Sequence, residues 1–386
     1  MVHIDRLLDL DLPAGRSAFL WGARKTGKTT YLRTRYPSSV VYDFLRTDLY
    51  LELSKRPFLL REQLLARPEA EFVSPVILDE VQKVPEVLDE VHWLIENRSM
   101  SFILCGSSAR KLKRGSANLL GGRAWRFELL PLVSAEIGEV PLLHVLNNGL
   151  IPAHFLEKDA TRSLRGYVND YLKEEVFAEG LTRSVPAFSR FFEAMGYSHG
   201  ELVNFSSIAR DCGVDSKSVR EYYQILVDTL LGRFVEPFAR RSSRQVISRA
   251  PKFYLFDVGV AGAITRRRLS EERGEAFGRA LEHLILMELA AYISYRNLDC
   301  GIKFWRTKSG LEVDFVLGEA EVAVEVKGTS RVERRDLRGL AAFSEEHGPR
   351  SCYLVCLETI ERRAGTIRVL PWARFLEQLW DGAVIS

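Results

Sequence analysis

The sequence lacks long apolar runs. The longest apolar stretches, such as residues 253–264, are broken by Asp257 and by glycine, and none reaches the ~18–20 residues that a membrane-spanning helix needs. The first residues carry acidic side chains and no continuous apolar core, unlike a secretory signal peptide. We therefore expect a soluble protein with no membrane partner.

Cysteine is scarce. The 386 residues include five cysteines, an odd number without metal-binding spacing. Cys352 and Cys356 share an apolar stretch, so we expect buried free thiols. Free thiols are typical of a reducing compartment, and the predicted location is the cytoplasm.

A large excess of charge is also missing. Lys and Arg number 54 against 51 Asp and Glu, a net charge of +3. With 46% hydrophobic residues, this composition excludes disordered and collagen-like chains, and roughly 150 residues per domain predicts two or three domains. A net charge this close to zero argues against a protein that neutralises many nucleic-acid phosphates. It can nevertheless conceal a basic groove, because basic residues gather at 240–252, 266–268 and 331–338.

The first 145 residues show an α/β pattern. Short apolar runs alternate with longer amphipathic segments, and the middle runs are apolar almost throughout, as in a parallel sheet covered on both faces. The predicted strands are Ser17–Trp21, Ser39–Phe44, Pro75–Glu80, Ser101–Gly106 and Ala124–Pro131. Helical patterns dominate from about residue 152. A long helix from about residue 275 precedes further predicted strands at Lys303–Trp305, Glu312–Leu317 and Val322–Val326.

A phosphate-binding loop is the strongest motif. Gly22, four further residues and Gly27-Lys28-Thr29 lie between a predicted strand and a predicted helix. Glycines let backbone N–H groups face phosphate oxygens, Lys28 would neutralise the β- and γ-phosphates of ATP, and Thr29 would bind Mg²⁺. The predicted phosphate contacts are Gly22, Ala23, Arg24, Lys25, Thr26, Gly27, Lys28, Thr29 and Thr30. The alternative is a glycine turn without a ligand.

A second motif, PVILDEVQKVP, delivers two carboxylates at a strand end. Asp79 is predicted to hold Mg²⁺ through water, and Glu80 to polarise the attacking water as a general base. Taken alone, the motif would equally fit an acidic strand end that starts a helix.

Polar and basic residues follow the next strand. We predict that Ser107 senses the γ-phosphate, the alternative being a simple loop. Arg123 is the predicted arginine finger, chosen from a basic set whose other members are Arg110, Lys111, Lys113, Arg114 and Arg126. Solvated surface arginines are the alternative. A finger supplied by a neighbouring subunit would require a homo-oligomer.

These motifs together resemble a family. GARKTGKTT, ILDEVQKVP, CGSSARKL and GGRAWRFELLPLVSAEI look like the AAA-like ATPases of bacteria and archaea that are fused to an uncharacterised C-terminal region. The resemblance covers essentially the whole chain. It implies nucleotide hydrolysis more firmly than any biological role.

Residues 205–238 have the pattern of a helix-turn-helix. The turn would lie at Gly213, Asp215 or Ser216 would cap the second helix, and Val219, Tyr222, Tyr223, Leu226 and Leu230 would form its inner face. Ser216, Lys217, Ser218 and Arg220 would face DNA, as residue types suited to phosphate contacts. The strand-like RFVEPF and a basic stretch, 240–249 with Lys252, predict a wing. Protein docking, or bracing of a neighbouring domain, is the alternative.

The last region carries a D…E-x-K pattern. Strand alternation puts Glu325 and Lys327 on one face, and Asp314 lies on the preceding predicted strand. With Glu282 on the upstream helix, the pattern resembles the PD-(D/E)XK restriction-endonuclease-like core. That resemblance implies that Glu282, Asp314 and Glu325 bind Mg²⁺ or Mn²⁺ and that Lys327 positions or activates water. The alternatives are a salt-bridged strand pair and a nuclease fold that has lost activity.

The combined prediction is an α/β chain in four parts. They are an AAA-like P-loop ATPase domain (1–145), a helical connector (146–200), a winged helix-turn-helix (201–270) and an α/β restriction-endonuclease-like domain (271–386). The predicted function is ATP hydrolysis coupled to DNA engagement, with metal-dependent cleavage as a further hypothesis. One alternative is a nucleotide-gated signalling or scaffold protein whose rear domains bind a protein partner without cleavage. The other is a plain DNA-binding ATPase.

Overall fold

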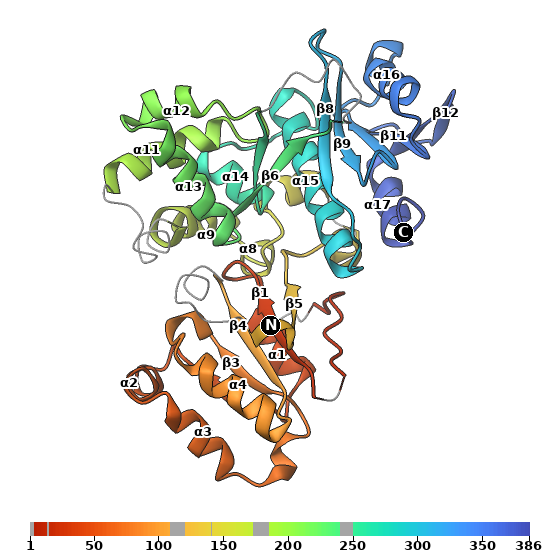
Figure 1. The fold of residues 1–386 in the computed structure, drawn as a ribbon. Coiled ribbons are helices and arrows are strands. Elements are labelled where there is room, and N and C mark those ends of the chain that lie inside the picture. Colours follow the sequence, from red (N-terminus) through yellow and green to blue (C-terminus); the bar gives the residue numbers. More distant parts are fainter. Residues whose placement is uncertain (1–3, 14, 109–119, 140, 173–184, 240–249) are drawn as a thin grey trace. The chain divides into compact units, whose positions relative to one another are not determined.

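The computed structural model describes residues 4–13, 15–108, 120–139, 141–172, 185–239 and 250–386. They form two compact units (Figure 1). The N-terminal unit comprises Leu8–Leu130 with Asp228–Leu231, and the C-terminal unit comprises Pro131–Val227 and Gly232–Ser386 with the described residues before Leu8. The basic candidates at 110–114 and the basic stretch 240–249 lie outside the described residues.

The N-terminal unit is built on a five-stranded parallel sheet of order β2-β3-β4-β1-β5. Its strands are β1 (Ser17–Trp21), β2 (Val41–Asp43), β3 (Val76–Asp79), β4 (Phe102–Gly106) and β5 (Ala124–Glu128). All five predicted strands are confirmed, with ends that differ by a few residues. The mixed α/β architecture with this parallel sheet is consistent with a P-loop NTPase fold.

Helices cover the N-terminal sheet (Figure 1). They are α1 (Lys28–Arg35), α2 (Thr47–Lys55), α3 (Phe58–Leu65) and α4 (Val87–Arg98). Alternate residues of the central strands, such as Phe19, Leu78 and Leu104, join one apolar core with residues of α2, α3 and α4. Because β1, β3 and β4 are buried along their whole length, their sequences are apolar almost throughout.

The parallel arrangement brings the predicted motifs to one edge of the sheet. Trp21, the last residue of β1, pairs with Gly106, the last residue of β4, and Asp79 ends the neighbouring β3. The loop after Trp21, the acidic pair at Asp79 and Ser107 therefore all follow carboxyl ends of adjacent strands. Ligands of open α/β sheets bind at this edge.

The C-terminal unit contains an eight-stranded mixed sheet of order β12-β13-β11-β10-β9-β8-β6-β7. Its strands are β6 (Gly232–Pro237), β7 (Lys252–Leu255), β8 (Ile302–Arg306), β9 (Glu312–Leu317), β10 (Val322–Val326), β11 (Ser351–Cys356), β12 (Arg362–Ala364) and β13 (Ile367–Pro371). Its described helices are α6 (Ser134–Ile137), α7 (Leu142–Asn148), α8 (Pro152–Phe155), α9 (Ala160–Gly166), α11 (Val185–Tyr197), α12 (Phe205–Cys212), α13 (Ser216–Asp228), α14 (Val258–Ile264), α15 (Glu275–Tyr295), α16 (Arg338–His347) and α17 (Trp372–Trp380). A π-helical turn spans Tyr167–Leu172.

The predicted helix-turn-helix is present as two helices and a glycine turn. Gly213 joins α12 to α13 with a φ of 66°, a backbone conformation that favours glycine. Asp215, rather than Ser216, caps α13, because its Oδ1 accepts a 2.8 Å hydrogen bond from the Ser218 N–H. Val219, Tyr222, Tyr223 and Leu226 are buried as predicted, whereas Leu230 is half-buried and lies beyond Asp228, where α13 ends.

The predicted wing strands belong to a larger sheet. β6 pairs antiparallel with β7 and parallel with β8, where Glu236 lies opposite Lys303. The two strands therefore extend the sheet that carries the D…E-x-K pattern. The division of this unit into connector, winged helix and nuclease-like domain stays a prediction.

The expectation of buried free thiols is met. All five cysteines are free, and four of them are buried: Cys105, Cys212, Cys352 and Cys356. In the part of the chain that the structure describes, no helix combines the length and apolar character needed to cross a membrane.

Candidate functional site

The phosphate loop turns tightly after β1. A Cβ at Gly22 would lie 2.5 Å from the Leu129 carbonyl oxygen, so only glycine fits there. Gly27, the residue before α1, has a φ of 94°. Thr26 closes the turn by donating its hydroxyl to the Ala23 carbonyl at 2.8 Å. The two glycines thus serve the loop conformation that a phosphate cradle requires.

Lys28 points back into its own loop. Its Nζ donates to the carbonyl oxygens of Gly22 at 2.7 Å and Ala23 at 3.1 Å, and the residue is 6% exposed. These acceptors are neutral, so the positive charge of Lys28 stays available to an anion. Arg24 is half-buried beside it, whereas Lys25, Thr29 and Thr30 are exposed.

Thr29 and Asp79 meet across the two motifs. The Thr29 hydroxyl donates to Asp79 Oδ2 at 2.7 Å, and Asp79 Oδ1 accepts the Glu80 N–H at 3.0 Å. A hydroxyl and a carboxylate are the hard oxygen ligands that Mg²⁺ prefers, usually with waters and phosphates completing its shell. The two residues therefore fit the predicted Mg²⁺ site.

Glu80 has an unusual backbone and a shifted pKa. Its φ of 58° and ψ of 41° are left-handed, a strained conformation for a non-glycine residue. Burial raises the pKa of Glu80, while the positive charges of Lys28 and Arg24 oppose the rise. A carboxylate with a raised pKa is better suited to accept a proton near neutral pH.

Gln82 is a site residue that the sequence analysis missed. Its Nε2 donates to Glu80 Oε2 at 2.5 Å and to Ser107 Oγ at 3.2 Å, so one amide joins the predicted base to the predicted sensor. Gly106 makes room for that amide, because a Cβ there would lie 2.3 Å from Gln82 Oε1. The available signal was a polar, uncharged residue two positions after Glu80, between Val81 and Lys83.

Arg123 lies away from the phosphate edge of its own sheet. It precedes Ala124, which pairs with Ser17 at the start of β1, whereas the loop follows the end of β1. Its Nε donates to Glu96 Oε1 of α4 in a half-exposed ion pair. The structure therefore does not bring Arg123 together with Lys28 and Glu80, and a role as arginine finger would require a second copy of the chain.

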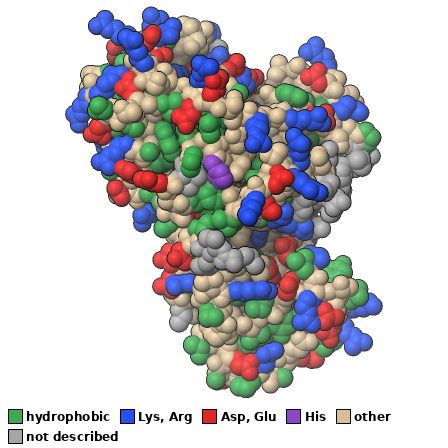
Figure 2. Space-filling model, turned by 180° about the vertical axis from the view of Figure 1, so that it is seen from behind, with side chains coloured by type: hydrophobic (Ala, Val, Ile, Leu, Met, Phe, Trp, Pro, Cys, Tyr) green, Lys and Arg blue, Asp and Glu red, His purple; other side chains and the backbone are tan. Residues whose placement is uncertain are grey.

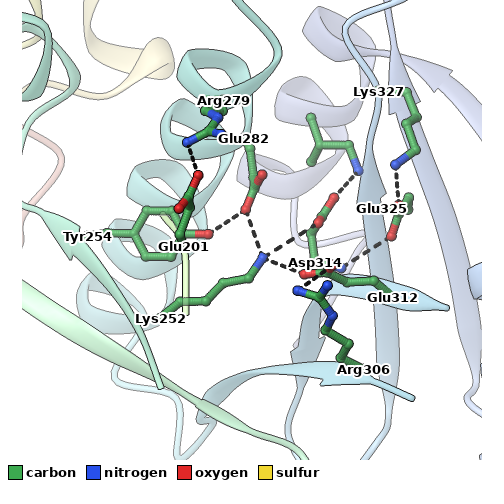
Figure 3. Close-up of polar contacts among 11 residues, drawn as sticks. Glu201, Lys252, Tyr254, Arg279, Glu282, Arg306, Glu312, Asp314, Glu325 and Lys327 are labelled. Atoms are coloured by element: carbon green, nitrogen blue, oxygen red, sulfur yellow. Dashed lines mark hydrogen bonds and ion pairs between the residues drawn. The ribbon is translucent and has the colours of Figure 1, made fainter. Parts of the chain in front are cut away.

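The D…E-x-K residues gather in the C-terminal unit. We use the name carboxylate cluster for Glu282, Glu312, Asp314 and Glu325, which come from α15, β9 and β10 (Figure 3). Asp314 and Glu325 bridge the two strands where regular pairing ends. The Val326 N–H donates to Asp314 Oδ2 at 2.8 Å, and the Asp314 N–H donates to Glu325 Oε2 at 3.2 Å. Lys327 donates to Glu325 Oε1 at 2.5 Å.

Lys252 occupies the middle of this cluster. Its Nζ lies 2.7 Å from Glu312 Oε1, 3.3 Å from Glu282 Oε1 and 4.0 Å from Asp314 Oδ1. The prediction that Lys252 belongs to a basic wing is therefore wrong. Its side chain is 6% exposed and turned toward carboxylates; β7 is the edge strand of the sheet, and all four of its residues are buried.

The charges of the cluster are strongly coupled. Burial raises the pKa of Asp314 well above its usual value, and Glu325 and Glu282 add to the rise. Burial also raises the pKa of Glu325, to about 7. Burial alone would lower the pKa of Lys252, but Glu282, Asp314 and Glu312 more than reverse that effect and raise it. The ammonium is thus firmly held in its charged form.

The carboxylate cluster does not fit the predicted Mg²⁺ or Mn²⁺ site. Across the described ranges, no group of three or more His, Cys, Asp or Glu side chains is arranged to hold a metal ion. Glu282, Asp314 and Glu325 are brought near one another, but an ammonium lies among the carboxylates.

Two of the candidate DNA-facing residues on α13 already make contacts within the chain. Ser218 donates its N–H and hydroxyl to Asp215, and the Arg220 guanidinium lies 4.4 Å from the centre of the Phe205 ring. Lys217 and Arg220 are exposed, and Ser216 is half-buried. On the face shown in Figure 2, Lys and Arg side chains alternate with Asp and Glu. The described surface therefore offers individual basic contacts rather than one continuous patch on that face.

Comparisons with known proteins divide the chain into three parts. Residues 15–138 match the model of an AAA domain family. Residues 142–271 and 277–375 each match a domain of unknown function, DUF8612 and DUF4143.

Two curated relatives are similar over part of their length. They are an uncharacterized protein of Mycobacterium bovis and one of Mycobacterium tuberculosis, each 26% identical over 265 residues, which is 66% of this chain and 59% of the relative. The chain thus spans less than two thirds of these relatives. Together the matches show an N-terminal AAA domain of the P-loop NTPase class followed by two domains of unknown function.

Proposed function

We propose that the N-terminal unit binds ATP with Mg²⁺ and hydrolyses its terminal phosphoanhydride bond. The hydrogen bond from Thr29 to Asp79, with Glu80 directly beyond it, carries this proposal. It joins a phosphate loop to a carboxylate pair at the carboxyl edge of a parallel sheet. The match of this region to an AAA domain family supports it.

The loop supplies the binding of phosphates. Backbone N–H groups between Gly22 and Thr29, at the start of α1, would face the phosphate oxygens. Lys28 would exchange its two carbonyl partners for β- and γ-phosphate oxygens, a stronger charge-assisted pairing. Thr29 and Asp79 would hold Mg²⁺, which neutralises charge on the phosphates when bound.

Glu80 supplies the general base. Its carboxylate would take a proton from the water that attacks the γ-phosphorus, as the bond to the leaving ADP oxygen breaks. Gln82 positions that carboxylate and links it to Ser107, which would report the presence of the γ-phosphate. Arg123 of a neighbouring copy would complete the site in a homo-oligomer.

The test of this proposal is Lys28→Ala. We expect loss of both nucleotide binding and turnover, measured with a fluorescent ATP analogue and by phosphate release. Lys55→Ala, an exposed lysine at the end of α2, is the matched control and should behave as wild type. Turnover by Lys28→Ala equal to that of wild type would contradict the assignment.

DNA engagement is the proposed use of the C-terminal unit. The observation in its favour is the α12–Gly213–α13 turn with exposed Lys217 and Arg220. Lys217→Ala should weaken binding to duplex DNA similarly for all sequences, because a phosphate contact carries no sequence information. It should also reduce the dependence of affinity on salt by about one phosphate contact. Fluorescence anisotropy over a salt series measures both, and an unchanged salt slope would favour a protein partner.

Cleavage by the C-terminal unit has less support than binding without cleavage. Asp314, Glu325 and Lys327 lie close together, which is the observation in favour of cleavage, but Lys252 is placed among the carboxylates. The geometry therefore favours a nucleotide-gated protein whose C-terminal unit binds a partner without cutting. Incubation with linear and supercoiled DNA in Mg²⁺ or Mn²⁺, with and without ATP and with Asp314→Ala as control, separates the two. Cutting by wild type alone would establish the nuclease.

A further inference from the structure

The carboxylate cluster is organised around an ammonium group from a distant part of the chain. Lys252 begins β7, and its Nζ lies 5.4 Å from the centre of the Phe304 ring of β8. Its contacts with Glu312 at 2.7 Å and Glu282 at 3.3 Å connect β7 to both β9 and α15 (Figure 3). The lysine thus lies where acidic side chains of separate elements converge.

The oxygens of the cluster are already engaged by donors within the chain. Asp314 Oδ2 accepts the Val326 N–H, and both oxygens of Glu325 accept bonds, one from the Asp314 N–H and one from Lys327. Glu282 Oε1 accepts the Tyr254 hydroxyl as well as Lys252. A divalent cation would have to replace several of these donors to acquire ligands.

Lys252 and a divalent cation would also compete for one location. Mg²⁺ and similar cations need carboxylate oxygens at roughly 2.0–2.6 Å. The Glu312 and Glu282 oxygens that converge on the cluster lie within hydrogen-bonding distance of the Lys252 ammonium. Two cations so close together in a buried setting repel each other strongly.

We infer that Lys252 is a built-in counter-ion that takes the place of a divalent cation in the carboxylate cluster. Its ammonium pairs with Glu312 and Glu282 and lies 4.0 Å from Asp314, so the wild-type cluster binds no Mg²⁺ or Mn²⁺. Removing the ammonium while keeping the length of the side chain turns the cluster into a divalent-cation site.

The experiment titrates MnCl₂ into the full chain without nucleotide and counts bound Mn²⁺ by electron paramagnetic resonance. The proteins are wild type, Asp314→Asn, Lys252→Met and the double variant with both substitutions. Wild type and Asp314→Asn should bind the same amount of Mn²⁺, because neither uses the cluster. Lys252→Met should bind one further Mn²⁺ per chain, and the double variant should lose it.

Two results would overturn the inference. One is a Mn²⁺ bound by wild type and absent from Asp314→Asn, since the cluster would then hold metal beside Lys252. The other is a folded Lys252→Met protein, checked by circular dichroism, that gains no Mn²⁺. If Lys252→Met does not fold, wild type and Asp314→Asn decide alone, with equal binding supporting the inference and a difference of one Mn²⁺ overturning it.

Discussion

Two buried lysines in this chain have opposite surroundings. Lys28 of the N-terminal unit donates to two neutral carbonyl oxygens, whereas Lys252 of the C-terminal unit lies among three carboxylates. The charge of Lys28 remains available to a ligand, and the charge of Lys252 is balanced inside the fold. Of these two lysines, we therefore expect Lys28 rather than Lys252 to bind an anion.

The acidic residues of the two regions differ in the same way. Asp79 and Glu80 accept bonds from a hydroxyl, a backbone N–H and an amide, all of them neutral donors. Glu325 and Glu312 accept from the ammonium groups of Lys327 and Lys252. The carboxylates of the first region thus have neutral donors as partners, whereas those of the second are paired with ammonium groups.

The largest expected effect is on catalysis in the N-terminal unit. Glu80→Gln should lower kcat by about 10²–10⁴-fold, because the amide cannot accept the proton of the attacking water. ATP binding should persist, since Lys28 and Thr29 are untouched. Phosphate release and nucleotide binding are measured in parallel, with the exposed Glu86→Gln as control. A normal kcat for Glu80→Gln would remove Glu80 from the mechanism.

The next prediction compares how much each of the two buried lysines contributes to the free energy of unfolding. Lys252→Met should lower the free energy of unfolding by about 3–5 kcal/mol, because it leaves buried carboxylates without their cation. Lys28→Met should cost only about 1–3 kcal/mol, the range for leaving buried neutral acceptors unpaired.

Denaturant unfolding of both variants measures this difference. Lys303→Met is the control, since Lys303 pairs with the exposed Glu319 and should contribute little. Equal losses for Lys252→Met and Lys28→Met would contradict the proposed contrast.

A smaller effect should follow from breaking the link between Glu80 and Ser107. Gln82→Ala removes an amide that bonds a charged carboxylate, an interaction worth about 1.5–3 kcal/mol. We expect kcat to fall roughly 10- to 100-fold with little change in ATP affinity. The control is Gln63→Ala, because Gln63 lies on α3 away from the loop. A change in affinity alone would place Gln82 in nucleotide binding instead.

The last prediction concerns stability at acidic pH, where the expected change in the free energy of unfolding within one pH unit is small. Burial lowers the pKa of His283 to about 3, below its ordinary value of 6.5, so the folded state binds fewer protons than the unfolded chain between these values. The contribution of His283 to stability is therefore complete above pH 6.5 and is lost, at up to about 1.4 kcal/mol per unit, as the pH drops toward 3.

Hydrogen exchange at a series of pH values follows this loss in each unit. His283→Gln should flatten the pH dependence of the C-terminal unit, and His92→Gln in the N-terminal unit should not. An unchanged slope in His283→Gln would assign the acid sensitivity to other groups.

Local patterns allowed most of the N-terminal unit to be predicted. Each strand is a short apolar run, and the loop is a contiguous motif whose glycines follow from close backbone approach, as Gly22 against Leu129 shows. The parallel order then places Asp79 beside Thr29 without further information. Gln82 was not predicted, because its importance depends on a hydrogen bond to Ser107, which follows β4 and is distant in sequence.

The C-terminal cluster was only half predictable. Asp314, Glu325 and Lys327 follow strand alternation, so their proximity was expected. Lys252 could not be placed, because its partners lie on α15 and β9, far along the chain, and because the basic stretch before it suggested a surface. Long-range sheet order, rather than any local pattern, decides where that lysine points.

Gly106 leaves the space that the side chains of Gln82 and Trp21 occupy. A methyl group at this position would lie 2.3 Å from Gln82 Oε1 and 3.0 Å from Trp21 Cζ3. Gly106→Ala would therefore retain every proposed catalytic group. It would displace the Gln82 amide from its position between Glu80 and Ser107. We therefore expect a methyl group at this strand position to weaken the proposed coupling between detection of the γ-phosphate at Ser107 and activation of water at Glu80.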